Sequence, residues 1–256
     1  MADNQYASLI FNNKASADLG ILIQYPFQVV HPQIDGDPIH IEGRSGDFLP
    51  DVNSYQNVTE TFNVIVNRSP NLSQADWERQ VTDWLTSPVV RGRRQYQYLQ
   101  FDYDPDYAYS AIQKDPFSFQ WDETNIGRAT GQIPFYCEPF QYRVDGINYI
   151  DLPSQGIVYN QELRDALPNW HFIANGSFTL IVNNKEYQFD NMNGEFWVNG
   201  DTCDTYDSNH NLLNDQTHFP NLITPILTPG ENHISITAGA GVIQKAEYMP
   251  RWRRLI

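Results

Sequence analysis

Cysteine is scarce in this chain. Only Cys137 and Cys203 occur among 256 residues, far apart, without a Cys-x-x-Cys pair or a histidine at zinc-ligand spacing. A small disulfide-bonded fold and a structural zinc site both need more cysteines at closer spacing. We therefore expect two buried thiols, no disulfide framework and no structural zinc site.

Long hydrophobic runs are also missing. The longest, such as Leu19–Ile23, fall far short of the roughly 20 apolar residues that a membrane-spanning helix needs. The first residues, Met1–Phe11, lack the basic region and apolar stretch of a secretory signal. We expect a protein that is made in a cytoplasm and does not insert into a membrane.

Positive charge is in short supply. The chain has 16 Lys and Arg against 31 Asp and Glu, a formal net charge of -15. A nucleic-acid-binding surface needs the opposite sign, because its affinity comes largely from neutralising phosphates. The imbalance excludes such a surface as the main function.

Motifs for catalysis and metal binding are absent as well. The chain has no His-Glu-x-x-His, no Gly-x-Ser-x-Gly and no glycine-rich phosphate loop. The stretch Asp102–Asp106 is spaced like the start of a calcium loop, but Tyr107 and Gln113 stand where that loop requires Gly and Glu. A second acidic stretch, Asp201–Asn209, is an alternative cation loop, and 31 acidic residues leave a glycosidase carboxylate pair open. We expect no catalytic residue, no metal and no cofactor.

Short alternating runs of aromatic and β-branched residues dominate what is present. Tyr55–Val66 alternates in this way, and Phe178–Phe189 does so around the turn Asn183-Asn184. Such runs, broken by Asn, Gly and Pro, are typical of strands joined by tight turns. We predict a mainly β protein, with a hairpin at each of these two runs.

One segment has helical periodicity. Ser73 is a suitable N-cap, Asp76 lies in the first turn, and the pattern ends before Pro88. We predict a helix near 74–86 that packs an apolar face onto a sheet. Four residues form that face: Trp77, Val81, Trp84 and Leu85.

The composition changes after the aromatic stretch Phe135–Tyr142. Turn residues follow in quick succession, and beyond Ile157 they recur at the spacing of a β-sandwich. We predict an N-terminal β-domain over residues 1–143, shaped as a sandwich or barrel with one helix, and a C-terminal β-sandwich over residues 144–256.

Two basic clusters stand out against the negative background. Arg91-Gly92-Arg93-Arg94 follows the predicted helix, and Arg251-Trp252-Arg253-Arg254 lies close to the last residue. Such clusters are either solvated or paired with acidic groups on a neighbour. We select Arg91, Arg93 and Arg94 as candidate residues for contacts between subunits.

Two tryptophans suggest a different class of function. Trp170 and Trp197 lie in the second half among asparagines and His171, a composition that suits sugar stacking on a sandwich face. A carbohydrate-binding module that contacts host cell-wall glycans is therefore the alternative to an assembly protein. Burial of both rings in the core is the competing interpretation.

The order of motifs resembles a known family, the distal tail (Dit) proteins of siphophages that infect Gram-positive bacteria. The resemblance spans most of the chain, in the expected order. It is carried by Phe11–Asn13, Asp18–Ile21, Gly43–Asp47 with Tyr55, Phe135–Tyr142, Tyr206–Asn209, Phe219–Leu222, Pro229–Asn232 and Arg251–Arg253.

The resemblance implies a non-enzymatic hub at the distal end of a virion tail. Its N-terminal domain would close into a homo-hexameric ring, and its C-terminal domain would be galectin-like and point outward. The ring would join the major tail (tube) protein to the tail-tip or tail-associated lysin protein, and in some phages the outer domains hold receptor-binding proteins. DNA would pass through the ring without specific binding. The matched turn residues, among them Gly43, Gly46 and Gly230, would serve the backbone.

Overall fold

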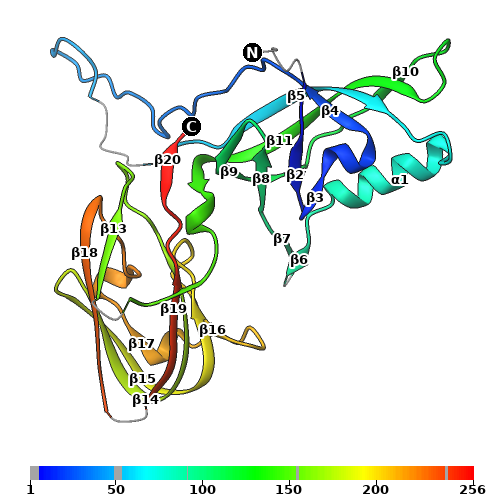
Figure 1. Ribbon diagram of the computed structural model, residues 1–256. Helices are drawn as coiled ribbons and strands as arrows, with labels where there is room; N and C mark the ends of the chain where they lie inside the picture. The colour runs from blue at the N-terminus through cyan, green and yellow to red at the C-terminus, as the bar shows by residue number, and fades with distance from the viewer. Residues whose placement is uncertain (1–5, 49–53, 91, 154–155, 240–241) are drawn as a thin grey trace. The chain divides into compact units, whose positions relative to one another are not determined.

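The computed structural model describes residues 6–48, 54–90, 92–153, 156–239 and 242–256. The chain is mainly β with one α-helix, as predicted. It divides into two compact units (Figure 1), one of residues 1–141 with 255–256 and one of residues 142–254. The last two residues, predicted to lie in the second domain, thus belong to the first unit.

The first unit is built on one ten-stranded, curled sheet. Its strands follow the order β1-β4-β5-β11-β9-β8-β2-β3, with β10 and β20 beside β11. A separate hairpin, β6–β7, has two strands only. The elements are β1 (Tyr6–Ala7), β2 (Leu9–Phe11), β3 (Lys14–Ala15), η1 (Ser16–Leu19), β4 (Ile21–Gln24), β5 (Val58–Asn67), α1 (Gln74–Leu85), β6 (Val89–Val90), β7 (Arg93–Arg94), β8 (Gln97–Phe101), β9 (Asp104–Ile112), β10 (Phe119–Trp121), β11 (Arg128–Arg143) and β20 (Arg253–Leu255).

Strand β5 shows the predicted alternation. Its buried face carries every second residue from Val58 to Val66, while the residues between them are exposed or half-buried. The predicted hairpin at this run is wrong, because β5 is one ten-residue strand paired with β4 on one side and β11 on the other. A central strand and a hairpin arm share the same two-residue period, so alternation alone cannot distinguish them.

Helix α1 begins and ends within one residue of its predicted bounds. The Ser73 hydroxyl accepts a hydrogen bond from the amide of Asp76 at 3.1 Å and caps the first turn. The indole of Trp77 donates to the carbonyl of Leu19 at 2.7 Å, and that of Trp84 donates to the carbonyl of Phe11 at 2.8 Å. The two tryptophans therefore attach the helix to the sheet, as predicted.

The second unit has its own sheet and its own core. Strand order is β12-β19-β14-β15-β16, with β18 beside β14 and β13, and β17 beside β15. The elements are η2 (Val144–Gly146), β12 (Ile150–Asp151), β13 (Ile157–Asn160), β14 (Asn169–Val182), β15 (Lys185–Val198), β16 (Thr205–Asp207), η3 (Asn214–Gln216), β17 (Thr217–His218), η4 (Pro220–Leu222), β18 (Gly230–Ala238) and β19 (Ile243–Met249).

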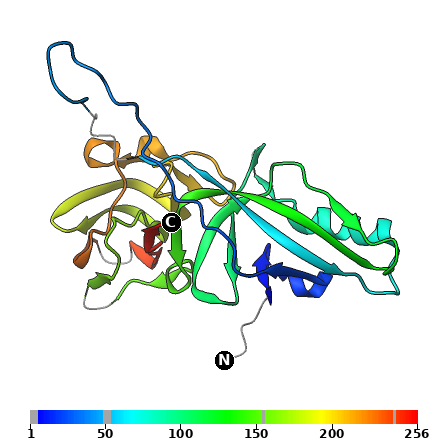
Figure 2. The same ribbon diagram turned by 90° about the horizontal axis from the view of Figure 1, so that it is seen from above.

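The long hairpin β14–β15 organises this unit, and Figure 2 shows both strands curving along their length. Its turn residues Asn183 and Asn184 have φ of 50° and 64°, as the predicted tight turn requires. At Gly176 (φ 109°) the register shifts, and the second neighbour of β14 changes from β19 to β18. One strand thereby serves two sides of the unit.

Glycines fit the backbone roles that were expected. Gly43, Gly46 and Gly230 have φ of 79°, 84° and 88°, a region in which other residues are strained. Cys137 is fully buried and Cys203 half-buried, and both are free thiols. No helix in the described part of the chain is long and apolar enough to cross a membrane.

Candidate interaction surfaces

The first basic cluster lies on the hairpin β6–β7, which follows helix α1. Two register pairs hold it together, Val89 with Arg94 and Val90 with Arg93. Gly92, at φ 75°, supplies the turn between the strands. Glycine adopts this positive φ without the steric cost that a side chain would bring.

The side chains of this hairpin are exposed. Val89 is 57% exposed and Val90 36%, and Arg93 and Arg94 are exposed beside them. Arg94 donates one long hydrogen bond of 3.3 Å to the carbonyl of Ser87. Arg91, the third candidate, lies outside the described residues. Each face of the hairpin thus presents one valine and one guanidinium, Val89 with Arg94 and Val90 with Arg93, a combination suited to an acidic, partly apolar neighbour.

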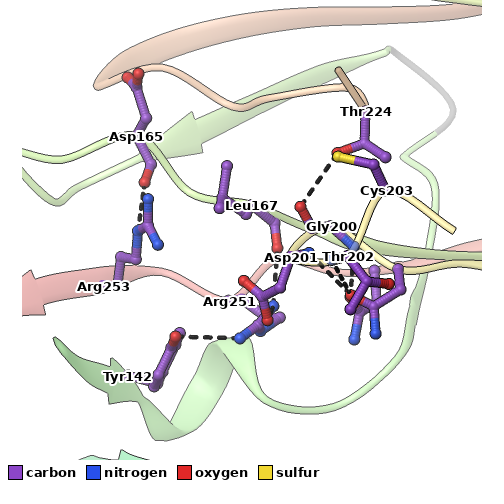
Figure 3. Close-up of polar contacts among 12 residues, drawn as sticks. Tyr142, Asp165, Leu167, Gly200, Asp201, Thr202, Cys203, Thr224, Arg251 and Arg253 are labelled. Atoms are coloured by element: carbon purple, nitrogen blue, oxygen red, sulfur yellow. Dashed lines mark hydrogen bonds and ion pairs between the residues drawn. The ribbon is translucent and has the colours of Figure 1, made fainter. Parts of the chain in front are cut away.

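The second basic cluster has a different environment. Arg251 is 6% exposed and forms an ion pair with Asp201 in the second unit. Its guanidinium donates to the hydroxyl of Tyr142 at 3.1 Å and lies 4.9 Å from the centre of that ring. Figure 3 shows Arg251 between these two residues. The expectation that this cluster reaches a neighbouring subunit is wrong for Arg251, whose charge is used within the chain.

The next two residues in the sequence, Trp252 and Arg253, are also held by contacts within the second unit. The ring of Trp252 packs against the second core, and Gly146 approaches it so closely that an added Cβ would lie 2.8 Å from the indole. Arg253 donates to the carbonyl of Asp165 at 2.7 Å (Figure 3). These contacts join the first and last residues of the second unit.

Neither candidate tryptophan offers a face for a sugar. Trp170 is 0% exposed and stacks on Tyr248 inside the second core, with ring centres 5.7 Å apart. Its proposed role in sugar stacking is therefore wrong. Residue 170 points to the buried face of β14, and period-2 alternation in a strand places residue 171 on the opposite face.

Trp197 lies on that opposite face, in a row of rings. His171 on β14 stacks against it at 4.8 Å with an interplanar angle of 12°, and Tyr206 on β16 stacks at 6.0 Å with an angle of 16°. Since these neighbours come from the strands on either side of β15, they occupy both faces of the indole. A sugar would have to displace one of them to stack on Trp197.

The same row is held by hydrogen-bond contacts between a histidine and two carboxylates. His171 places one ring nitrogen 2.7 Å from Glu247 and the other 2.9 Å from Glu195. Hydrogen bonds from Lys245 and His171 hold the pKa of the Glu247 carboxyl below its usual range. The row is therefore a cross-strand network whose polar groups already have partners.

The buried face of β5 includes an acid, Glu60, at one of the alternate positions of the predicted strand. Glu60 is 0% exposed, and burial raises the pKa of its carboxyl to about 7. Its Oε1 accepts a hydrogen bond from the amide of Val30 at 3.0 Å, whereas Oε2 has no hydrogen-bond partner among the described residues. The only sequence signal was an acid at an inward position of an apolar face.

Val30 belongs to an exposed segment of the first unit, residues 27–48, which we call the arm. Its root is fixed: Phe27 packs on Phe62 with ring centres 5.0 Å apart, and the Nδ1 of His31 lies 3.0 Å from the carbonyl oxygen of Ile256. Beyond the root, every residue from 33 to 48 is exposed. The sequence signal for it is a pair of isoleucines at alternate positions, Ile39 and Ile41, among acidic residues.

The acidic loops hold no recognisable cation site. No group of three or more His, Cys, Asp or Glu side chains within the described ranges is arranged to bind a metal. Asp207 accepts hydrogen bonds from the amides of Asn209 and Asn211 at 2.9 and 2.8 Å, and Asp204 accepts one from the side chain of Asn214 at 3.0 Å. These carboxylates order the loop itself.

No protein-family model and no curated protein sequence matches this chain. A solved structure does match it, namely the crystal structure of the Dit protein (gp 19.1) of SPP1, presented as a paradigm of the hub adsorption apparatus in phages that infect Gram-positive bacteria. The TM-score is 0.59 at 14% sequence identity, over 94% of this chain and 96% of that one. The chain therefore has a Dit-like β fold over nearly its whole length.

Proposed function

We propose that this chain is a non-enzymatic structural hub of a phage tail tip or baseplate. In this role six copies form a ring that joins the tail tube protein to the tail-tip protein. The observation that carries the proposal is the fold match to SPP1 Dit, which extends over 94% of the chain and so includes both units. A match restricted to one β-domain would carry much less, because such domains serve many functions.

The two units divide this work. The first unit is the ring-forming domain, since it holds the exposed hairpin β6–β7 and the arm, which are surfaces suited to contacts between subunits. The second unit is the galectin-like attachment module, which points outward and holds receptor-binding proteins where a baseplate has them. Its closure by the Arg251 network supports its role as an independent module.

The charge of the chain suits a channel for DNA. A net charge of -15 gives a ring whose lining repels phosphates. The genome would then pass without binding to the wall. In this proposal the protein is made in the host cytoplasm and resides at the distal end of the virion tail.

The carbohydrate-binding alternative has lost the residues that motivated it. Trp170 is buried, and both faces of Trp197 are occupied. We therefore do not propose glycan binding for the aromatic row.

The proposal is tested by the mass and shape of the purified protein. Light scattering coupled to size exclusion should give the mass of six copies, and negative-stain images of the same fraction should show rings. If the protein stays monomeric both alone and when co-expressed with the tube protein of the same phage, the ring-forming role is contradicted.

A further inference from the structure

Two exposed surfaces of the first unit have complementary chemistry. The arm presents large apolar side chains, including Ile39 at 51% and Ile41 at 43% exposure. The hairpin β6–β7 presents Val89 and Val90. Apolar side chains gathered on exposed backbone usually mark a surface that a partner covers.

The charges of the two surfaces are opposite. Among residues 27–48 of the arm there are four acids and one arginine, a formal charge of -3 with histidines neutral. The acids are Asp35, Asp37, Glu42 and Asp47. The hairpin carries +2 from Arg93 and Arg94 alone. Opposite charges on two patches steer them together and fix their register.

The backbones are also suited to pairing. The hairpin consists of two register pairs and forms a sheet of its own, so its outer edges are unused by other named strands. The arm is extended at Ile39, which exchanges hydrogen bonds of 2.7 and 2.8 Å with Phe48 in an isolated bridge. An extended segment can add a strand to an open edge while alternate side chains give specificity.

From these observations we propose that the arm of one copy docks on the hairpin β6–β7 of a second copy of this chain. The two surfaces do not cover each other within one chain, since the side chains of both remain exposed. Each chain has one arm and one hairpin, so contact between copies is head-to-tail and closes into a ring when the rotation per copy allows. The inference rests on the proposed assembly role and names the contact that would drive it.

A pair of charge-reversed variants tests the contact. The hairpin variant carries Arg93→Glu and Arg94→Glu, and the arm variant carries Asp37→Lys and Glu42→Lys. Each variant alone pairs like charges at every contact and should run as a monomer in light scattering. In an equal mixture each arm meets a hairpin of opposite sign, so the mass of the wild-type oligomer should return.

Matched controls change the same charge at exposed positions elsewhere. Arg79→Glu with Lys185→Glu controls for the hairpin variant, and Glu186→Lys with Asp215→Lys controls for the arm variant. Both controls should keep the wild-type mass. Circular dichroism of all variants should match the wild type, because every substituted side chain is exposed.

The outcomes separate this inference from the proposed function. Rings that persist in both variants, or a mixture that stays monomeric, overturn the docking inference while the hub role stands. A wild type that does not self-associate overturns the inference as well. The wild type and the equal mixture could also form open filaments that are lost in each variant alone. That result would support the docking contact and contradict the ring.

Discussion

Two arginine clusters with nearly the same sequence have opposite environments. In Arg-Gly-Arg-Arg at 91–94, Arg93 and Arg94 are exposed on a hairpin, whereas in Arg-Trp-Arg-Arg at 251–254 the first arginine is buried and paired with Asp201. The second residue accounts for the difference. Trp252 packs on an apolar core, and this packing places the adjacent Arg251 in a buried position. Gly92 has no side chain to pack and serves only the turn. The environment of a charged motif is thus set by the apolar residue within it.

The largest effect in this comparison is expected from Arg251→Ala. The substitution removes the ion pair with Asp201 and the hydrogen bond to Tyr142, and it leaves a buried space. Asp201 is 40% exposed and is hydrated without its partner, so the loss comes from the charged hydrogen bonds and from the empty space, together about 3 kcal/mol of unfolding free energy, measurable by urea denaturation. Arg251→Lys should lose less, because an ammonium keeps the charge but cannot form both contacts. A loss no larger than that of an exposed arginine would contradict the assigned role.

A buried charge without a full set of partners provides the next test. Glu60 has a pKa of about 7 in the folded chain against 4.5 in the unfolded chain, mainly because of burial. The folded state therefore binds this proton more tightly. The contribution of Glu60 to the free energy of unfolding is about 3 kcal/mol. It is present in full below pH 4.5 and is lost as the pH rises through about 7.

The variant Glu60→Gln isolates that contribution. An amide can still accept the hydrogen bond from Val30, yet it does not titrate. Relative to wild type, the variant should gain unfolding free energy steadily between pH 4.5 and 7 and stay constant above. A wild-type-minus-variant difference that is flat over this range would show that Glu60 has an ordinary pKa.

Gly92→Ala tests the turn of the exposed hairpin. An alanine at φ 75° is strained by about 1 kcal/mol, and no atom crowds the added Cβ. Because the strain favours other conformations of this exposed turn, the docking conformation becomes less populated and the oligomer dissociation constant should rise about five-fold, while the cores of both units unfold as in the wild type. Gly194→Ala, at φ 91° in the second unit and equally uncrowded, is the matched control and should leave assembly unaffected.

The smallest effect on stability is expected for Arg93→Ala combined with Arg94→Ala. Both side chains are exposed, so the unfolding free energy should change by less than about 0.5 kcal/mol. Thermal unfolding followed by circular dichroism checks this. A clear loss of stability would mean that the hairpin arginines act within the chain, as Arg251 does.

Regular features of this fold were predictable because each has a local cause. Helix α1 was found from its cap and the spacing of Trp77 and Trp84, and the turn at Asn183-Asn184 from residues that tolerate positive φ. The buried face of β5 followed from alternation. These signals lie within a few residues of one another, so a single sequence suffices to read them.

The candidate site residues depend on distant contacts and were harder to predict. Whether Trp170 or Trp197 faces the core depends on strand register, and the stacking of Trp197 on His171 and Tyr206 requires three strands to be adjacent. The partner of Arg251 lies 50 residues away in the sequence. The only pattern in the arm is the alternate pair Ile39 and Ile41, which is too short to distinguish it from an ordinary loop.

One measurement tests most directly whether the exposed cluster acts between chains and the buried cluster within one. For Arg93→Glu/Arg94→Glu and for Arg251→Ala, the oligomer mass is measured by light scattering below the unfolding temperature of both, and the unfolding midpoint is measured in urea. The hairpin variant should lose the oligomer and keep the unfolding midpoint that the wild type has when diluted to a monomer, whereas Arg251→Ala should keep the oligomer and unfold at a lower midpoint. A hairpin variant that assembles like the wild type would contradict the account.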